Sequence, residues 1–181
     1  MRNKSITLGG GCFWCTEAIF RATEGVLGVK SGFSGGFIKN PPYREVRTGR
    51  TGHAEVVQIS YDPEKISLQE LLKIHLMTHD PTTLNQQGAD KGNQYRSIIL
   101  YADDDEKIVA EKVIKNLQHF YSMPIVTELA QFTAFYEAEE DHQNYYAENP
   151  EAFYCEMVIA PKLAKYKESK DGYLLSSNDV D

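Results

Sequence analysis

Long apolar runs, abundant cysteine and an excess of positive charge are all missing from this sequence. No apolar stretch approaches the ~20 residues that cross a bilayer, and the start, MRNKSITLGG, is too short and polar for a secretory signal. Three cysteines are too few for a disulfide-stapled secreted fold. A net charge of −7 offers no electrostatic footprint for nucleic acid or an anionic membrane surface. The sequence therefore predicts a cytoplasmic protein with reduced thiols and with no nucleic-acid or membrane partner.

The composition is that of an ordinary globular chain. Of 181 residues, 41% are hydrophobic and 25% are charged, which suits one domain with a sizeable core. No internal repeat or low-complexity linker interrupts the chain. We expect a single catalytic domain over residues 1–168, followed by a polar tail over residues 169–181 that can be disordered.

Hydrophobic periodicity and turn residues predict alternating strands and helices. Strands are expected at residues 4–8, 26–34, 54–61, 95–102 and 125–132. Helices are expected at residues 12–22, 67–79, 104–120 and 138–148, the second opened by a Ser67–Glu70 capping box. This order is close to the split β-α-β signature, so we expect an α+β fold, a ferredoxin-like sandwich with helices packed on a mixed sheet. Two long loops, 38–52 and 80–94, are typical of functional segments.

A cysteine follows three glycines at the expected end of the first strand. The glycines allow a sharp turn, and the helical pattern that follows places Cys12 at or just before a helix N-terminus. Free backbone N–H groups there favour an anion, so we expect a thiolate nucleophile with a lowered pKa. The alternative is a buried structural thiol. Cys15 completes a C-x-x-C spacing, which supports either a disulfide or half of a zinc site.

A carboxylate stands at the start of an alternating strand. By strand parity Glu55 shares the apolar face of residues 54–61 with Val57, Ile59 and Tyr61. An ionised carboxylate is costly there, so desolvation would raise its pKa and keep it protonated, as a general acid requires. Parity alone equally allows a salt-bridged or edge-exposed glutamate.

The remaining candidates are weak when each is taken alone. Tyr43, Asp90 and Tyr95 lie in or next to the two long loops. Each one alone is equally typical of a polar loop residue or of an aromatic residue that packs against the core. His75 and His79 are four residues apart on an apolar stripe, which favours core histidines over a metal pair. His142, in an acidic stretch, is expected to be a solvated helix residue that could neighbour the site.

Taken together, these stretches resemble peptide methionine sulfoxide reductase of the A type. The matches run in order over nearly the whole chain, from residue 11 to about residue 165. They are residues 11–14 (GCFW), 35–36 (GG), 40–43 (NPPY), 51–55 (TGHAE), 79–82 (HDPT), 87–90 (QGAD), 94–97 (QYRS) and 138–143 (AEEDHQ). The combination is far more specific than any single motif.

The resemblance implies roles for particular residues. Cys12 sits at the position of the family's nucleophile, Phe13 and Trp14 at the aromatics that pocket the substrate's S-methyl group, and Glu55 at the acid that protonates the sulfoxide oxygen. Around that oxygen it implies two hydrogen-bonding tyrosines and a supporting carboxylate, which are Tyr43, Tyr95 and Asp90. The family acts on the S epimer, free or within proteins, and thioredoxin regenerates it. The resemblance implies no metal and no cofactor.

The sequence departs from the family pattern in its cysteines. The residue three after the nucleophile is often small in the family, whereas here it is Cys15. A C-terminal FYC segment followed by VIAPK matches a segment that carries a resolving cysteine in many members, so we expect Cys155 to resolve and keep Cys15 as the second candidate. No further cysteine follows, which excludes the two-resolver relay of some members.

Three other functions fit parts of the pattern. A thioredoxin-like C-x-x-C thiol-disulfide oxidoreductase would make Cys15 essential and would turn over disulfides. A zinc-binding module would need a second ligand pair beyond Cys12 and Cys15. A thiol hydrolase that uses Cys12 with His53 or His142 would need no reductant.

Overall fold

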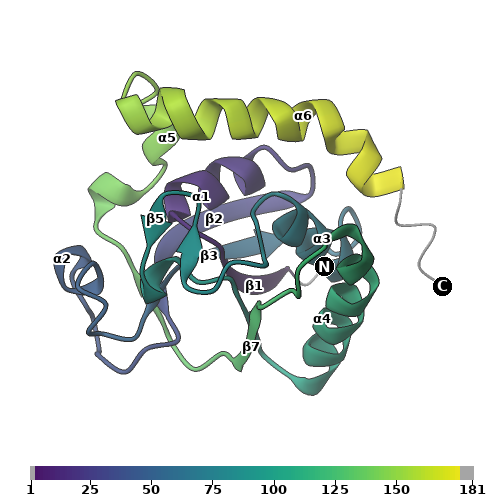
Figure 1. Cartoon of the computed structure of the whole chain (residues 1–181), viewed down its shortest axis with the longest axis horizontal. Helices are drawn as coiled ribbons and strands as arrows, with labels where there is room; N and C mark the ends of the chain where they lie inside the picture. Colours follow the sequence, from purple (N-terminus) through teal and green to yellow (C-terminus); the bar gives the residue numbers. More distant parts are fainter. Residues whose placement is uncertain (1–2, 176–181) are drawn as a thin grey trace.

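A six-stranded mixed sheet forms the centre of the computed structural model (Figure 1), which describes residues 3–175 and the side chains of residues 3–169. The strand order is β7-β6-β1-β3-β2-β8, and a separate hairpin pairs β4 with β5. The strands are β1 Lys4–Gly9, β2 Val26–Ser34, β3 Ala54–Tyr61, β4 Gln86–Gln87, β5 Asp90–Lys91, β6 Ile98–Tyr101, β7 Glu128–Gln131 and β8 Phe135–Glu137. Neighbours are antiparallel except β6 and β7, which are parallel.

Helices cover one face of this sheet and one end of it. The α-helices are α1 Phe13–Arg21, α2 Tyr43–Val46, α3 Leu68–Met77, α4 Asp104–Leu117, α5 Tyr145–Glu148 and α6 Ala160–Leu175. Short 3-10 turns η1 Asn93–Tyr95, η2 Gln118–Phe120 and η3 Glu140–His142 and a π-helical turn η4 Cys155–Ile159 complete the described chain. Figure 1 shows α6 crossing above α1, with α3 and α4 side by side. No helix in residues 3–175 is both long and apolar enough to span a membrane.

The topology confirms the expected α+β class. Two split β-α-β units, β1-α1-β2 and β3-α3-β6, interleave so that their strands occupy the four central positions of the sheet. Residues of β3 that share a face with Glu55, including Val57, Ile59 and Tyr61, pack in the main core with α1, α3 and α4. The opposite face buries a smaller cluster that contains Val56 and Ile98. Strand alternation thus separates two cores.

Several expected boundaries are wrong for local reasons. The loop 80–94 contains the β4–β5 hairpin, and Tyr95 lies in η1, so that β6 begins at Ile98. The expected helix at 138–148 is replaced by η3 and α5, because the chain leaves edge strand β8 with Ala138 donating to the carbonyl of Ser31. Between η3 and α5, Asn144 adopts a left-handed conformation at φ 53° that interrupts a helix.

The ends of other elements also shift. The expected helix 104–120 is α-helical to Leu117 and closes with η2, and the expected strand 125–132 is shortened to β7. The polar tail was expected from Ser169, yet α6 continues to Leu175. Residues 176–181 of that tail lie outside the described part of the chain.

The capping box that opens α3 gives a test of the local structure. The Ser67 side chain accepts the Glu70 N–H at 3.1 Å, and the Glu70 carboxylate accepts the Ser67 N–H at 3.1 Å. We expect Ser67→Ala to lower the free energy of unfolding by about 1 kcal/mol, since it leaves an orphan helix amide. Urea denaturation measures the change. Ser122→Ala, at an exposed serine outside any helix, is the control, and equal effects of the two would contradict the capping role.

Candidate active site

A glycine turn between β1 and α1 presents Cys12. Gly11 has φ 85° and its N–H donates to the carbonyl of Tyr95 at 3.1 Å. A Cβ on Gly10 would lie 2.8 Å from the ring of His79, so only glycine fits there. Cys12 itself is the N-cap residue of α1. The sequence-based position of Cys12 at a helix N-terminus is therefore confirmed.

Glu55 lies beneath this helix start and is buried. Its side chain comes from the second residue of β3 and is 1% exposed. One carboxyl oxygen accepts the backbone N–H of Phe13 at 3.2 Å, and the other has no hydrogen-bond partner within the described residues. Burial raises the pKa of Glu55 to about 8, although the Phe13 N–H opposes this shift. Of the two readings that strand parity left open, the desolvated carboxyl is the one observed.

The Cys12 thiol does not have the lowered pKa that its helix position predicted. Burial raises the pKa of Cys12 well above its usual value, and negative charge on Glu55 and Cys15 raises it further, while the Trp14 backbone N–H lowers it. Desolvation of a side chain that is 9% exposed outweighs the helix N-terminus. Near neutral pH, both the thiol and the carboxyl of this pair therefore hold their protons.

The three remaining predicted polar residues surround this pair. Tyr43 begins α2, Asp90 begins β5 and Tyr95 ends η1. Burial raises the pKa of Tyr43 to about 12, and negative charge on Glu55, Cys12 and Asp90 adds to the shift. The pKa of Tyr95 is raised for the same reasons. The fold thus brings together five residues that are far apart in sequence and whose charges influence one another's pKa: Cys12, Tyr43, Glu55, Asp90 and Tyr95. Because the pKa values of both tyrosines are raised, their hydroxyls remain protonated and can donate hydrogen bonds.

Aromatic rings enclose the site on one side. Phe13 is fully buried, with its ring centroid 5.6 Å from that of Phe33 and 6.2 Å from that of Tyr43. Trp14 stacks on Tyr145 with ring centroids 3.7 Å apart. These contacts make Phe13 a core residue as well as a site residue.

His142 belongs to the same enclosure. Its ring centroid lies 4.1 Å from that of Tyr43 and 5.7 Å from that of Trp14, and the residue is 9% exposed. It was expected to be a solvated helix residue, but it lies in η3 and is buried. The acidic neighbours in sequence concealed this, since they face solvent while the imidazole packs inward.

The other two cysteines lie together behind Cys12. Cys15, on the first turn of α1, is 4% exposed, and Cys155, the first residue of η4, is fully buried. Both pack in one small cluster with Ala18 and Ile159. All three cysteines are free thiols in this structure.

Tyr154 is a site residue that sequence reasoning missed. Its hydroxyl donates to Asp90 at 3.0 Å and lies 3.7 Å from the sulfur of Cys15. The ring of Tyr154 meets that of Trp14 edge-on at 5.9 Å. The only signal was its place next to Cys155 in the sequence, because nothing local links residue 154 with residue 90.

His75, in α3, and His79, just beyond its end, are structural, as the apolar stripe indicated. His75 bonds through Nε2 to the carbonyl of Gly9 at 2.8 Å, and His79 bonds through Nε2 to the Ser97 hydroxyl at 2.7 Å. Burial lowers the pKa of His75 to about 4 and also lowers that of His79, so both rings are neutral. His53, the candidate base of a thiol hydrolase, instead accepts the Gly36 N–H and bonds to the carbonyl of Ile38.

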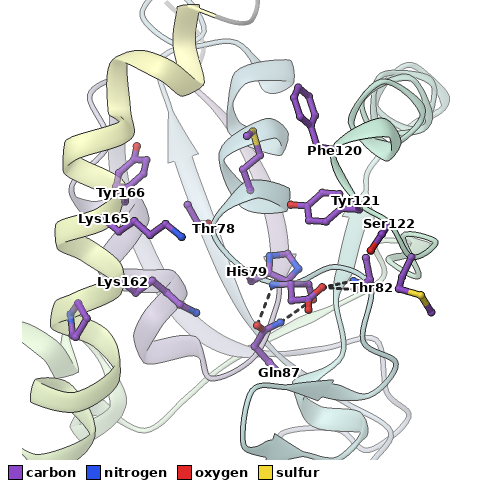
Figure 2. Close-up of a pocket in the computed structure, with 14 residues that line it drawn as sticks. Thr78, His79, Thr82, Gln87, Phe120, Tyr121, Ser122, Lys162, Lys165 and Tyr166 are labelled. Atoms are coloured by element: carbon purple, nitrogen blue, oxygen red, sulfur yellow. Dashed lines mark hydrogen bonds between the residues drawn. The ribbon is translucent and has the colours of Figure 1, made fainter.

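A cavity of about 730 Å³ lies beside the site (Figure 2). Figure 2 shows Lys162 and Lys165 of α6 on one side of it and Phe120 and Tyr121 on the other. None of the predicted site residues lines this cavity. His79 and Lys162 also line a narrow space next to Cys15, so the cavity borders the rear of the thiol cluster.

Burial of Glu55 predicts a pH-dependent stability. Between pH 4.5 and about 8 the folded state keeps a proton that the unfolded state has lost, so the free energy of unfolding falls as pH rises through this window. The loss is on the order of 5 kcal/mol, at 1.36 kcal/mol per pKa unit. We expect Glu55→Gln to remove this slope in urea denaturation curves. Glu64→Gln, at an exposed position, should keep it; an unchanged slope in Glu55→Gln would contradict the raised pKa.

Comparisons with known proteins agree on one family. A family model described as peptide methionine sulfoxide reductase matches residues 4–173. A curated relative, peptide methionine sulfoxide reductase MsrA of Sulfolobus acidocaldarius, is 53% identical over 163 residues, which cover 90% of this chain and 93% of the relative.

Solved structures are similar over most of the chain as well. The crystal structure of reduced Mxr1 from Saccharomyces cerevisiae has a TM-score of 0.81 and 37% identity, covering 85% of this chain and 90% of that one. Mxr1 in complex with Trx2 has a TM-score of 0.58 and 27% identity, covering 80% of this chain and 85% of that one.

Proposed function

Because the chain belongs to the peptide methionine sulfoxide reductase family, we propose that it reduces methionine S-sulfoxide, free and within proteins, to methionine. Membership makes it an oxidoreductase that acts on methionine sulfoxide. The observation that carries the finer proposal is the proton-bearing pair of Glu55 and Cys12 beside two phenols. The reaction needs a proton donor for oxygen and a sulfur nucleophile, and this pair supplies both.

The two protons of this pair suit the chemistry of a sulfoxide. Glu55, protonated below pH 8, donates to the sulfoxide oxygen, which makes the substrate sulfur electrophilic. The resulting carboxylate then accepts the proton of Cys12 as the Cys12 sulfur attacks. The oxygen then moves from the substrate sulfur to the Cys12 sulfur: the S–O bond of the substrate and the transient bond between the two sulfurs break, an S–O bond to Cys12 forms, and methionine leaves a sulfenic acid on Cys12. No net proton is consumed in this half of the cycle.

The surrounding side chains orient the substrate. Tyr43 and Tyr95 stay protonated and donate to the sulfoxide oxygen. Asp90 fixes Tyr154 across the site through its hydrogen bond. Half-buried Trp14 offers an apolar surface to the S-methyl group, and fully buried Phe13 supports it from the same core cluster, which distinguishes one epimer from the other when the oxygen is held.

The sulfenic acid then condenses with a second thiol to an intramolecular disulfide. We assign Cys155 as the resolving cysteine, with Cys15 as the second candidate. A thioredoxin, named in the complex solved for Mxr1, is the proposed reductant in a cytoplasmic setting. Exposed apolar side chains that flank Cys155, namely Phe153, Met157 and Val158, offer a surface on which such a protein could dock.

The first functional test concerns the nucleophile. We expect Cys12→Ser to lower the rate of methionine formation by at least about 10³-fold, because a hydroxyl cannot carry the oxygen as a sulfenic acid. Single-turnover assays with each sulfoxide epimer, quantified by chromatography of released methionine, measure it. If the unmodified protein reduces disulfides but no sulfoxide, the result would favour the thioredoxin-like alternative instead.

A second test concerns the general acid. We expect Glu55→Gln to lose about 10²-fold in the rate of methionine formation. In the parent the rate should decline as pH rises through about 8, where Glu55 loses its proton, and the variant should lack that decline. Pre-steady-state rates across pH 6–10 test both, with Glu64→Gln as control. If the rate of methionine formation in Glu55→Gln still falls with rising pH as in the parent, the titrating group is not Glu55.

A further inference from the structure

The large cavity beside α6 takes no part in the proposed reaction. Its volume of about 730 Å³ falls in the range of sites that hold a small molecule. Residues 77–80, at the end of α3, lie between α6 on one side and residues 120–123 on the other (Figure 2). Because none of the predicted site residues lines this cavity, a guest here would be distinct from the sulfoxide.

Two lysines give the cavity a positive charge, although the whole chain carries a net charge of −7. Lys162 and Lys165 lie three residues apart on one face of α6, and Figure 2 shows both side chains extending toward the cavity. Among the residues whose side chains are described, neither ammonium group has an ion-pair partner. The carboxylate of Asp80, which also lines the cavity, accepts hydrogen bonds from the N–H and the hydroxyl of Thr82. The two ammonium groups outnumber this carboxylate, so the described lining attracts an anion.

Several other polar groups of the lining are already bonded within the protein. The hydroxyls of Thr78 and Tyr121 donate to backbone carbonyls of α3 at 2.7 and 2.6 Å. The side-chain amide of Gln87 bonds at both ends to the backbone of Asp80, at 3.0 and 2.9 Å. These bonds hold the walls in place and leave the two ammonium groups to bind a polar guest.

The wall opposite the lysines is apolar. Phe120 and Met123 line it and are 56% and 61% exposed, so their side chains are accessible to a guest. Arginine, whose planar fork matches a carboxylate, is missing from the described lining. Lysine ammonium groups act as point charges that suit a phosphate. The lining therefore fits a molecule with a phosphate at one end and an apolar ring at the other.

We propose that this cavity is a binding site for a small aromatic phosphate. The phosphate pairs with Lys162 and Lys165, and the aromatic body packs against Phe120 and Met123. This inference goes beyond the proposed function and does not depend on it, because binding here requires neither a sulfoxide nor a thiol.

Titration calorimetry with two matched probes tests the site. The full-length protein is titrated with 1-naphthyl phosphate and, separately, with 1-naphthol, which has the same rings but no phosphate. We expect a Kd of about 1 mM or tighter for 1-naphthyl phosphate, as suits a ligand of this size, and a rise in this Kd with added NaCl. The Kd for 1-naphthol should be at least about tenfold higher. Equal affinity for the two probes, or no binding of 1-naphthyl phosphate, would overturn the proposal.

Lysine variants locate the phosphate. We expect Lys162→Met and Lys165→Met each to raise the Kd for 1-naphthyl phosphate at least about tenfold, because each removes one charge-assisted hydrogen bond. Methionine keeps the length of the side chain and is a good helix former, so α6 is retained. Lys167→Met, at an exposed lysine of the same helix outside the cavity, is the matched control and should bind as the parent does. If both cavity variants keep the parental Kd, the phosphate does not bind here and the proposal fails.

A phenylalanine variant locates the aromatic body. We expect Phe120→Ala to raise the Kd for 1-naphthyl phosphate at least about threefold, since it removes a ring that packs on the naphthyl group. Phe153→Ala, which trims an exposed phenylalanine outside the cavity, is the control and should leave the Kd unchanged. Equal Kd values for Phe120→Ala and the parent would contradict the proposed position of the aromatic body.

Discussion

The site depends on one hydrogen bond between a strand and a helix. The buried Glu55 carboxyl accepts the backbone N–H of Phe13, the first residue of α1. The bond ties the start of β3 to the helix that carries Cys12, and it partly offsets the cost of burying the carboxyl. The pairing of β1 with β3 already brings Cys12 and Glu55 into the same region, and this bond fixes the carboxyl against the start of the helix.

Around this bond, the fold recruits side chains from segments that are far apart in sequence. Cys12 and Glu55 come from the two split β-α-β units, Tyr43 from the connection between these units, and Asp90 and Tyr95 from the connection between α3 and β6. The C-terminal segment contributes Tyr154, whose hydroxyl donates a hydrogen bond to the Asp90 carboxylate. A strand and a helix start thus hold Glu55 and Cys12, and the connections between elements hold the polar side chains around them.

Local sequence signals were enough for the elements and residues that depend on local physics. Strands β2 and β3 have the expected bounds, the Ser67 capping box is present, and strand parity placed Glu55 on the buried face. The pKa of Cys12 was misjudged because burial by distant segments outweighs the nearby helix terminus. Tyr154 was missed, and His142 was wrongly expected to be solvated, because the position of each depends on contacts that only the tertiary fold creates.

The raised pKa of the Cys12 thiol has a protective consequence. Peroxides and other electrophiles attack thiolates far faster than thiols, and overoxidation to sulfinic acid is irreversible for most proteins. A buried thiol with a raised pKa, such as that of Cys12, the proposed nucleophile, stays protonated and is expected to resist such damage. An enzyme that reduces oxidised methionine works in the presence of the same oxidants. The burial and raised pKa of its Cys12 thiol therefore protect that thiol from irreversible overoxidation.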